Sequence, residues 1–238
     1  MNGRSWASNT GSRPLDALAE SWTRPERNMA FSKTILRHLG NPSGLTGRLF
    51  MWRLNRVNAG MNAFTYECLD LGEADRVLEI GFGGGALLGR ILAARKVVFV
   101  AGTDISALAV RTARARFRKA AAAGVQELRE CTDERLPFDD GAFSKVCCVN
   151  VIYFWPDVAA AMAEVHRVLS PGGRFVVCYA EGSPDGVTAF PPDVVEARLL
   201  KVGFATVATS HGSDRENGTY HCTVATKPAG SLARPASA

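Results

Sequence analysis

The stretch VLEIGFGGGALLGRIL, residues 77–92, decides the fold of this chain. A short apolar run comes first, four glycines then occupy five positions, and a helix-like apolar pattern follows. The glycines are Gly81, Gly83, Gly84 and Gly85. Glycine has no Cβ, so its backbone can adopt positive φ and approach a ligand closely. The stretch therefore predicts a buried strand, a turn that faces a ligand, and a helix.

Strand-like and helix-like patterns alternate after this turn. We predict strands at residues 76–80, 97–105, 125–131, 145–154, 174–180, 204–210 and 219–227, and helices at 86–96, 106–124, 157–169 and 194–203. Such alternation implies a parallel sheet covered on both faces. No helix separates the last two strands, so the last strand is predicted to be antiparallel. The fold class is α/β, a Rossmann-like, seven-stranded and mostly parallel sheet with helices on both faces.

The chain divides into four parts. Residues 1–24 are predicted to be a flexible N-terminal segment because they are polar and lack apolar periodicity. Residues 25–72 are predicted to be helical, with a turn at 41–47, and residues 73–227 form the α/β domain. Residues 228–238 are a polar tail that contains proline. Helices before the first strand usually cover the domain, although a basic amphipathic helix can also lie on a membrane.

The composition is that of an ordinary globular protein, with 47% hydrophobic and 21% charged residues. No apolar run reaches the roughly 20 residues of a membrane span, and the N-terminus lacks a signal-peptide core. We therefore expect a cytoplasmic protein. The six cysteines form no C-x-x-C pair, so we predict no metal site.

The charge is unevenly distributed. Residues 1–60 hold nine Lys/Arg and three acids, whereas the whole chain has a net charge of +5. This basic segment could attract a nucleic acid or an anionic surface. We favour the alternative that it is a solvated face and a flexible tail.

The glycine motif alone leaves two classes of cofactor open. Gly81-x-Gly83-x-x-Ala86 also fits the dinucleotide pattern, so a nicotinamide cofactor is compatible with it. Glu79, at the end of the strand, disfavours a pyrophosphate and suits a cationic amino group by its charge. Asp104 ends the second strand, where an acid can accept hydrogen bonds from both ribose hydroxyls.

Two further segments complete the pattern, LPFDDGAFSKVCCVNVIYFWPD at 136–157 and RVLSPGGRFVV at 167–177. With EIGFGGG at 79–85 and Asp104, they resemble the class I S-adenosylmethionine-dependent methyltransferases, in the branch that acts on small molecules. The resemblance includes the order and spacing of these segments. It implies that the cofactor is S-adenosylmethionine.

The resemblance also implies a role for the glycine loop and the acid before it. Gly81, Phe82, Gly83 and Gly85 would pass under the methionine and ribose of the cofactor. Glu79 would reach the amino acid end, directly or through water.

The adenosine end would lie against the second and third strands. The resemblance places Asp104 at the ribose and Ile105 beside the adenine. Family members often have an acid four residues before Leu-Pro, but this chain has Thr132 there. The neighbouring Asp133 could substitute for it.

The acceptor side would lie beyond the fourth, fifth and sixth strands. Asn150 and Val151, at the end of the fourth strand, resemble residues beneath the methyl-bearing sulfur. Tyr153 could steer the acceptor or simply pack. His211, predicted to lie in a loop at 210–218, could be a general base or an exposed histidine without a role. An Asn-Pro-Pro-Tyr type of motif is missing after the fourth strand, which argues mildly against amide and nucleobase substrates.

The resemblance implies that residues 25–72 form a lid over a small-molecule acceptor. The methyl group would go to an O, N or C atom of this acceptor, in secondary, quinone or lipid metabolism. Three lid arginines suggest an apolar acceptor with a carboxylate or phosphate: Arg48, Arg53 and Arg56. The alternatives are a methyltransferase of nucleic acids or membrane lipids, and a protein that binds the cofactor without transferring methyl. A homodimer through the lid helices stays open.

Overall fold

The computed structural model describes residues 52–132, 135–181 and 190–230. Its centre is a seven-stranded sheet in the order β3-β2-β1-β4-β5-β7-β6. The strands are β1 (Asp75–Ile80), β2 (Val97–Asp104), β3 (Gln126–Glu130), β4 (Phe143–Val149), β5 (Leu169–Ala180), β6 (Thr206–Asp214) and β7 (Gly218–Thr226). Only β7 runs against its neighbours, pairing antiparallel with β5 and β6. The predicted fold class is confirmed.

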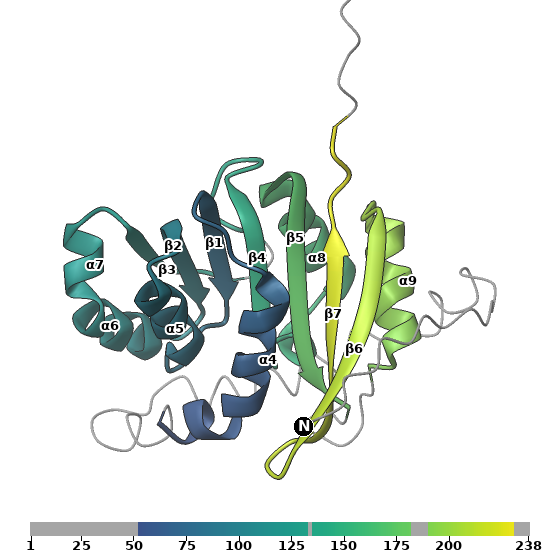
Figure 1. Cartoon of the computed structure of the whole chain (residues 1–238), viewed down its shortest axis with the longest axis horizontal. Coiled ribbons are helices and arrows are strands. Elements are labelled where there is room, and N and C mark those ends of the chain that lie inside the picture. The colour runs from purple at the N-terminus through teal and green to yellow at the C-terminus, as the bar shows by residue number, and fades with distance from the viewer. Residues whose placement is uncertain (1–51, 133–134, 182–189, 231–238) are drawn as a thin grey trace, which may run out of the picture.

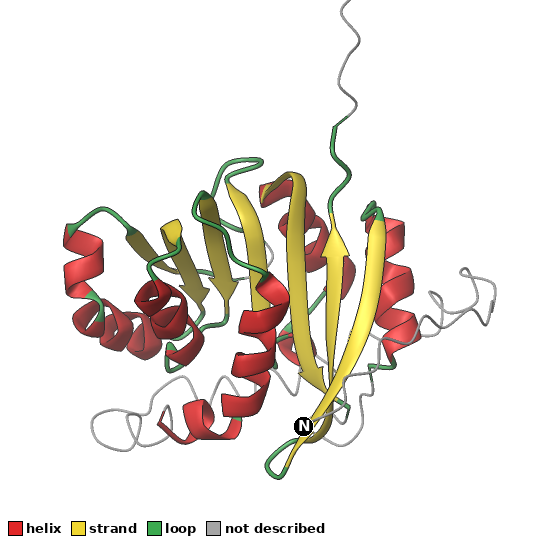
Figure 2. Cartoon of the chain, in the orientation of Figure 1, coloured by secondary structure: helices red, strands yellow, loops and turns green. Residues whose placement is uncertain are grey.

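Helices cover both faces of this sheet (Figures 1 and 2). On one face lie α4 (Ala59–Leu69), α5 (Ala86–Ala94) and α6 (Ala107–Arg116), which is followed by the short α7 (Arg118–Ala122). On the other face lie α8 (Val158–Val168) and α9 (Pro192–Val202). The side chain of Ser106 caps α6 by accepting a hydrogen bond from the Ala109 N–H, and Asp157 caps α8 in the same way.

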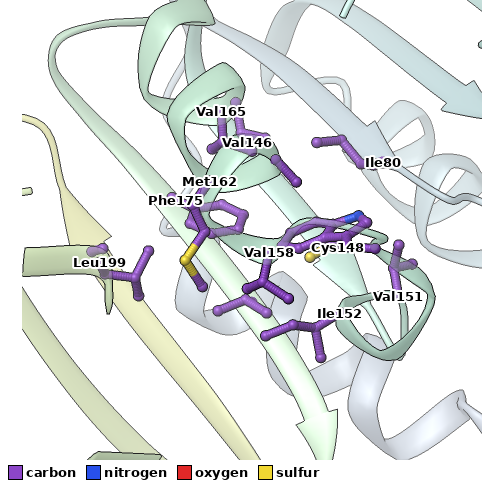
Figure 3. Packing of buried hydrophobic residues seen from close by; sticks show 14 of the residues in the cluster. Ile80, Val146, Cys148, Val151, Ile152, Val158, Met162, Val165, Phe175 and Leu199 are labelled. Atoms are coloured by element: carbon purple, nitrogen blue, oxygen red, sulfur yellow. The ribbon is translucent and has the colours of Figure 1, made fainter. Parts of the chain in front are cut away.

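Each sheet face has its own apolar core. Figure 3 shows part of the cluster beneath α8 and α9, where Val165 and Met162 of α8 approach Phe175 of β5. Strands β1, β4 and β5 are almost fully buried because side chains on both of their faces meet helices. In the described residues, no helix is long and apolar enough to cross a membrane.

The strand order reverses between β1 and β4. From β1 the chain proceeds to β2 and β3 on one side, and then returns to β4 and β5 on the other. Loops that leave β1 and β4 therefore diverge, and they leave a crevice at the carboxyl ends of these strands. In open α/β sheets this crevice is where ligands bind.

Several predicted boundaries are wrong. The strand predicted at 145–154 ends at Val149, and Ile152–Phe154 is a 3₁₀ turn. The reason is Asn150, which adopts a left-handed φ of 55° and whose side-chain oxygen accepts a hydrogen bond from the Ala180 N–H. The helix predicted at 106–124 is interrupted at Phe117. β5 begins at Leu169 because Leu169 pairs with Phe143.

The expected lid is described only in part. Residues 1–51, and with them Arg48 and most of the basic segment, lie outside the described residues. The segment 52–57 is helical and leads through Asn58 into α4, which packs on the sheet face. Phe64 and Tyr66 of α4 contact the Tyr220 ring and the Arg90 guanidinium, so these two aromatic rings face the domain.

Candidate active site

The glycine loop turns sharply after β1. Gly81, Gly83 and Gly85 have φ values of 68°, 50° and 68°, in the left-handed region that favours glycine. The Gly81 N–H donates to the Thr103 carbonyl at 2.7 Å, which holds the turn against β2. A Cβ on Gly83 would meet no atom within 4 Å, so the loop presents an open backbone surface there.

Two glycine substitutions should therefore have different effects. A Cβ on Gly81 would lie 2.5 Å from Val151 Cγ2, in addition to its strained φ. We expect Gly81→Ala to lower the free energy of unfolding by about 2–4 kcal/mol, because strain and overpacking add. Gly83→Ala should cost only about 1–2 kcal/mol, from strain alone. Urea unfolding of both variants measures this difference, and equal losses would contradict it.

Glu79 lies at the base of the loop and is 4% exposed. Its Oε2 atom is buried without a hydrogen-bond partner. Burial raises the pKa of Glu79 to about 8; a backbone hydrogen bond from Leu88 opposes this shift, and the nearby Asp104 carboxylate adds a smaller rise. A buried carboxyl oxygen without a hydrogen-bond partner is costly in a finished core. It is what a site would contain if a cationic ligand supplied the missing partner.

Asp104 ends β2 beside the loop. Its Oδ2 accepts a hydrogen bond from the Gly83 N–H at 2.7 Å, and its Oδ1 accepts one from the Ser106 N–H at 2.8 Å. Burial raises the pKa of Asp104, and these two hydrogen bonds oppose that shift. Each carboxylate oxygen keeps further acceptor capacity. The structure thus brings together Glu79, the glycine loop and Asp104, as the sequence predicted.

Asn150 and Val151 lie across the crevice from this loop. Val151 packs against Gly81, because a Cβ added to Gly81 would lie only 2.5 Å from Val151 Cγ2. The Asn150 side-chain amide donates to Asn58 Oδ1 at 3.0 Å and approaches the Met61 sulfur at 3.4 Å. Asn150 therefore joins β4, β5 and the segment that precedes α4.

The segment 52–58 lies over the carboxyl ends of the strands. Asn55 donates to the Gly84 carbonyl at 3.2 Å, and Asn58 accepts from Asn150. Asn217, in the hairpin turn between β6 and β7, donates to the Val57 carbonyl at 2.7 Å. We call residues 52–58 the lid segment, because these contacts fix it to the glycine loop, to β4 and to the hairpin.

The other predicted cofactor residues lie around this centre. Phe82 is 4% exposed and packs in the core; its N–H donates to the Thr103 carbonyl and its carbonyl accepts from the Gly85 N–H. Ile105 is 47% exposed directly after Asp104. Thr132 is exposed beyond the end of β3, and Asp133 lies outside the described residues.

Tyr153 is buried in the turn after β4, and its hydroxyl donates to the Ala180 carbonyl. Burial raises its pKa above the ordinary value for tyrosine. The phenol is therefore protonated at neutral pH, and its proton is already used by a backbone carbonyl. This arrangement favours a positioning role at the end of β5 over a role as a base.

His211 lies in strand β6 and not in a loop, so its predicted location is wrong. β6 extends to Asp214, which shortens the connection to β7 to a three-residue turn at 215–217. His211 pairs in register with His221, and their Nδ1 atoms are 2.7 Å apart. His221 is 5% exposed, and burial lowers its pKa. One Nδ1 must carry a proton and the other must accept it.

Four residues at this edge were missed by the sequence reasoning: Asn55, Asn58, Asn217 and His221. The three asparagines act through contacts with distant parts of the chain, which no local motif reveals. His221 lies within a run of four buried residues, 220–223, so no alternation along β7 singles it out. Among the described residues, no group of three metal-ligating side chains could hold a metal ion.

Comparisons with known proteins agree with this geometry. Residues 78–177 match the model of a methyltransferase domain family. The uncharacterized methyltransferase YdaC of Bacillus subtilis is 27% identical over 176 residues, which cover 72% of this chain and 94% of YdaC. The quinone C-methyltransferase UbiE of Bartonella quintana is 33% identical over 102 residues, 42% of this chain but only 39% of UbiE.

Solved structures share the fold. A phosphoethanolamine N-methyltransferase of Haemonchus contortus, in complex with phosphomonomethylethanolamine and S-adenosylhomocysteine, superposes with a TM-score of 0.65 at 15% identity. The superposition covers 76% of this chain and 57% of that protein. The unpartnered Oε2 of Glu79, the open backbone at Gly83 and the free acceptor capacity of Asp104 fit a cofactor with a cationic end and a ribose. These findings support the assignment of the chain to the class I S-adenosylmethionine-dependent methyltransferases, whose cofactor is S-adenosylmethionine.

Proposed function

We propose that the enzyme transfers the methyl group to a small apolar molecule, at an O, N or C atom. The observation that carries this proposal is the lid segment, which is hydrogen-bonded to Gly84, Asn150 and the β6–β7 turn. A lid fixed at these three places covers the carboxyl ends of the strands and limits the size of the acceptor that can reach them. It obstructs the approach of a folded protein or a duplex.

We assign the cofactor to the residues that surround the crevice. Glu79 binds the amino group, the backbone at Gly81, Gly83 and Gly85 passes beside the methionine and ribose, and Asp104 binds the ribose hydroxyls. Ile105 and Thr132 flank the adenine, where Asp133 is the nearest acid in the sequence. In this assignment residues 73–227 are the cofactor domain and residues 52–72 are the described part of the lid region.

For methyl transfer, the main task of the protein is to align the acceptor with the methyl group. When bound, S-adenosylmethionine supplies an activated methyl group on a sulfonium, and displacement gains mainly from proximity and orientation. Asn150 and Val151 line the crevice opposite the glycine loop and can set the position of the acceptor. Tyr153 fixes the end of β5 through the Ala180 carbonyl.

A base is needed only if the acceptor atom must lose a proton. The histidine pair is the candidate for that role, because His211 is exposed and can exchange protons with water, whereas His221 is buried. The pair lies in the half of the ladder that holds the carboxyl end of β6 and the amino end of β7, next to the Gly212–Tyr220 pair.

The relatives support an apolar acceptor. Proteins named as quinone C-methyltransferases match this chain at 32–33% identity over about 100 residues. The exposed Arg53 and Arg56 of the lid segment could receive a carboxylate or phosphate on the same acceptor.

The proposal is tested by following S-adenosylhomocysteine production with a panel of acceptors. We expect turnover of small phenols, quinols and lipid-like acids, and no turnover when an equivalent phenol is part of a folded protein. Asp104→Ala serves as the inactive control for spontaneous methylation. Turnover of transfer RNA or protein at a rate equal to the best small molecule would overturn the proposal.

A further inference from the structure

The surface formed by α5, α6 and α7 is strongly basic. From residue 80 to residue 126 the chain has a single acid, Asp104, which is 7% exposed. The same stretch has eight Lys/Arg, and all eight side chains are exposed: Arg90, Arg95, Lys96, Arg111, Arg114, Arg116, Arg118 and Lys119. The chain has 28 Lys/Arg and 23 acids in total, so 20 and 22 remain elsewhere. Residues 80–126 thus carry a net charge of +7, in addition to the +6 of residues 1–60, and the rest of the chain is acidic in balance.

These helices belong to one face of the molecule. α5 and α6 pack on the same side of the sheet as α4, and α7 continues from α6 (Figure 1). Arg90 of α5 lies over the Tyr66 ring of α4 at 4.4 Å. Among the described residues, none of the ion pairs within 4 Å involves any of the eight. The eight side chains therefore present their positive charge to solvent.

The lid segment extends this surface to the active site. Arg116 and Asn55 both donate to the Gly84 carbonyl at 3.2 Å, so α6 and the lid segment meet at the glycine loop. Arg53 and Arg56 are exposed, and Arg56 lies 5.9 Å from the centre of the Trp52 ring. Trp52 is 58% exposed. We call α5–α7 and the lid segment the basic surface.

The chemistry of the basic surface favours anionic lipid over nucleic acid. Helices α5, α6 and α7 contain no Asn or Gln, the side chains that read adenine edges. Among exposed large hydrophobic residues of the described chain, Trp52 is the only aromatic one, which gives no row of rings for stacking bases. A single tryptophan beside arginines is instead typical of the boundary between headgroups and acyl chains.

We propose that the protein docks on an anionic lipid bilayer through the basic surface, with Trp52 at the headgroup boundary. The docked orientation brings the glycine loop and the lid segment toward the bilayer. This inference goes beyond the proposed function, because docking requires neither the cofactor nor a particular acceptor.

The test is co-sedimentation of the full chain with vesicles. We expect binding to vesicles of phosphatidylglycerol and phosphatidylcholine, and little binding to phosphatidylcholine alone. Arg118→Gln/Lys119→Gln should weaken binding roughly tenfold or more, since each basic residue near an anionic surface contributes about fivefold. The matched control is Arg135→Gln/Lys201→Gln, two exposed basic residues outside the basic surface, and it should weaken binding less than threefold by the same reasoning.

Three outcomes would overturn the proposal. One is equal binding to neutral and anionic vesicles. Another is an equal effect of the two double variants, which would show a general effect of net charge. The last is tight binding of duplex RNA without binding to anionic vesicles. Because Arg118 and Lys119 are absent from the contacts of the glycine loop, S-adenosylmethionine titration of the variant should match the wild type, which separates this test from that of the cofactor site.

Discussion

Asp104→Ala is expected to reduce the affinity for S-adenosylmethionine by about 100-fold or more. Two hydrogen bonds from ribose hydroxyls to a carboxylate are worth about 1.5–3 kcal/mol each, and both would be lost. The substitution also removes the acceptor of the Gly83 N–H, which sits at 2.7 Å and holds the loop in place. Calorimetric titration with S-adenosylmethionine, S-adenosylhomocysteine and NAD measures the effect.

Asp75→Ala is the matched control for this variant. Asp75 also accepts two hydrogen bonds, from the Gly72 N–H at 2.7 Å and from the Ser144 hydroxyl at 2.6 Å. It lies at the start of β1, the opposite edge of the sheet from the crevice. Asp75→Ala should lower stability yet retain cofactor affinity within about threefold, as expected for distant sites. If Asp104→Ala bound S-adenosylmethionine with wild-type affinity, Asp104 would not be part of the cofactor site.

Sequence reasoning predicted the parts of the candidate site that are local in the chain. Glu79, Gly81 and Gly83 lie within five residues, and Asp104 follows at the end of the next strand, so strand periodicity placed them at one edge. The sheet itself was predictable because buried parallel strands are continuous apolar runs separated by helices.

The parts that failed depend on contacts between distant residues. The run from Val149 to Trp155 is apolar enough for a strand, but Asn150 ends it through a bond to Ala180, 30 residues away. Asn58 and Asn150 are 92 residues apart in the chain, and Asn217 and Val57 are 160 apart. Side-chain partners at such separations follow from the packed fold and not from any local pattern.

Glu79→Gln is expected to abolish the pH dependence of cofactor binding. Without cofactor, the pKa of Glu79 is about 8, so the group is protonated at neutral pH. Pairing with the cationic amino group needs the carboxylate. Binding must then release a proton, and the affinity of the wild type should rise by about tenfold per pH unit up to about 8. Glu79→Gln cannot ionise, so its affinity should stay flat.

The two proteins should therefore differ most near pH 8, where Glu79 ionises while the ligand amino group still carries its proton, and converge in acid, where the wild type is also neutral at this position. S-adenosylhomocysteine lacks the sulfonium but keeps the amino group, so it should show the same pH dependence if Glu79 binds that group. Calorimetry in buffers of different ionisation enthalpy counts the released proton directly. A parallel pH profile in Glu79→Gln would show that another group is responsible.

The same carboxyl group links pH to stability in the cofactor-free protein. Its folded-state pKa is raised above the unfolded value of about 4.5, so its stabilising effect is complete in acid and is lost as pH rises through about 8. Melting temperatures of wild type without cofactor should consequently fall relative to those of Glu79→Gln over this range. Saturating S-adenosylmethionine should reverse the difference, because the ligand binds the ionised form and so stabilises the wild type most where its free form is weakest. A carboxyl group that is destabilising at neutral to alkaline pH until a cation binds accounts for the Oε2 atom of Glu79 that lacks a partner in the cofactor-free core.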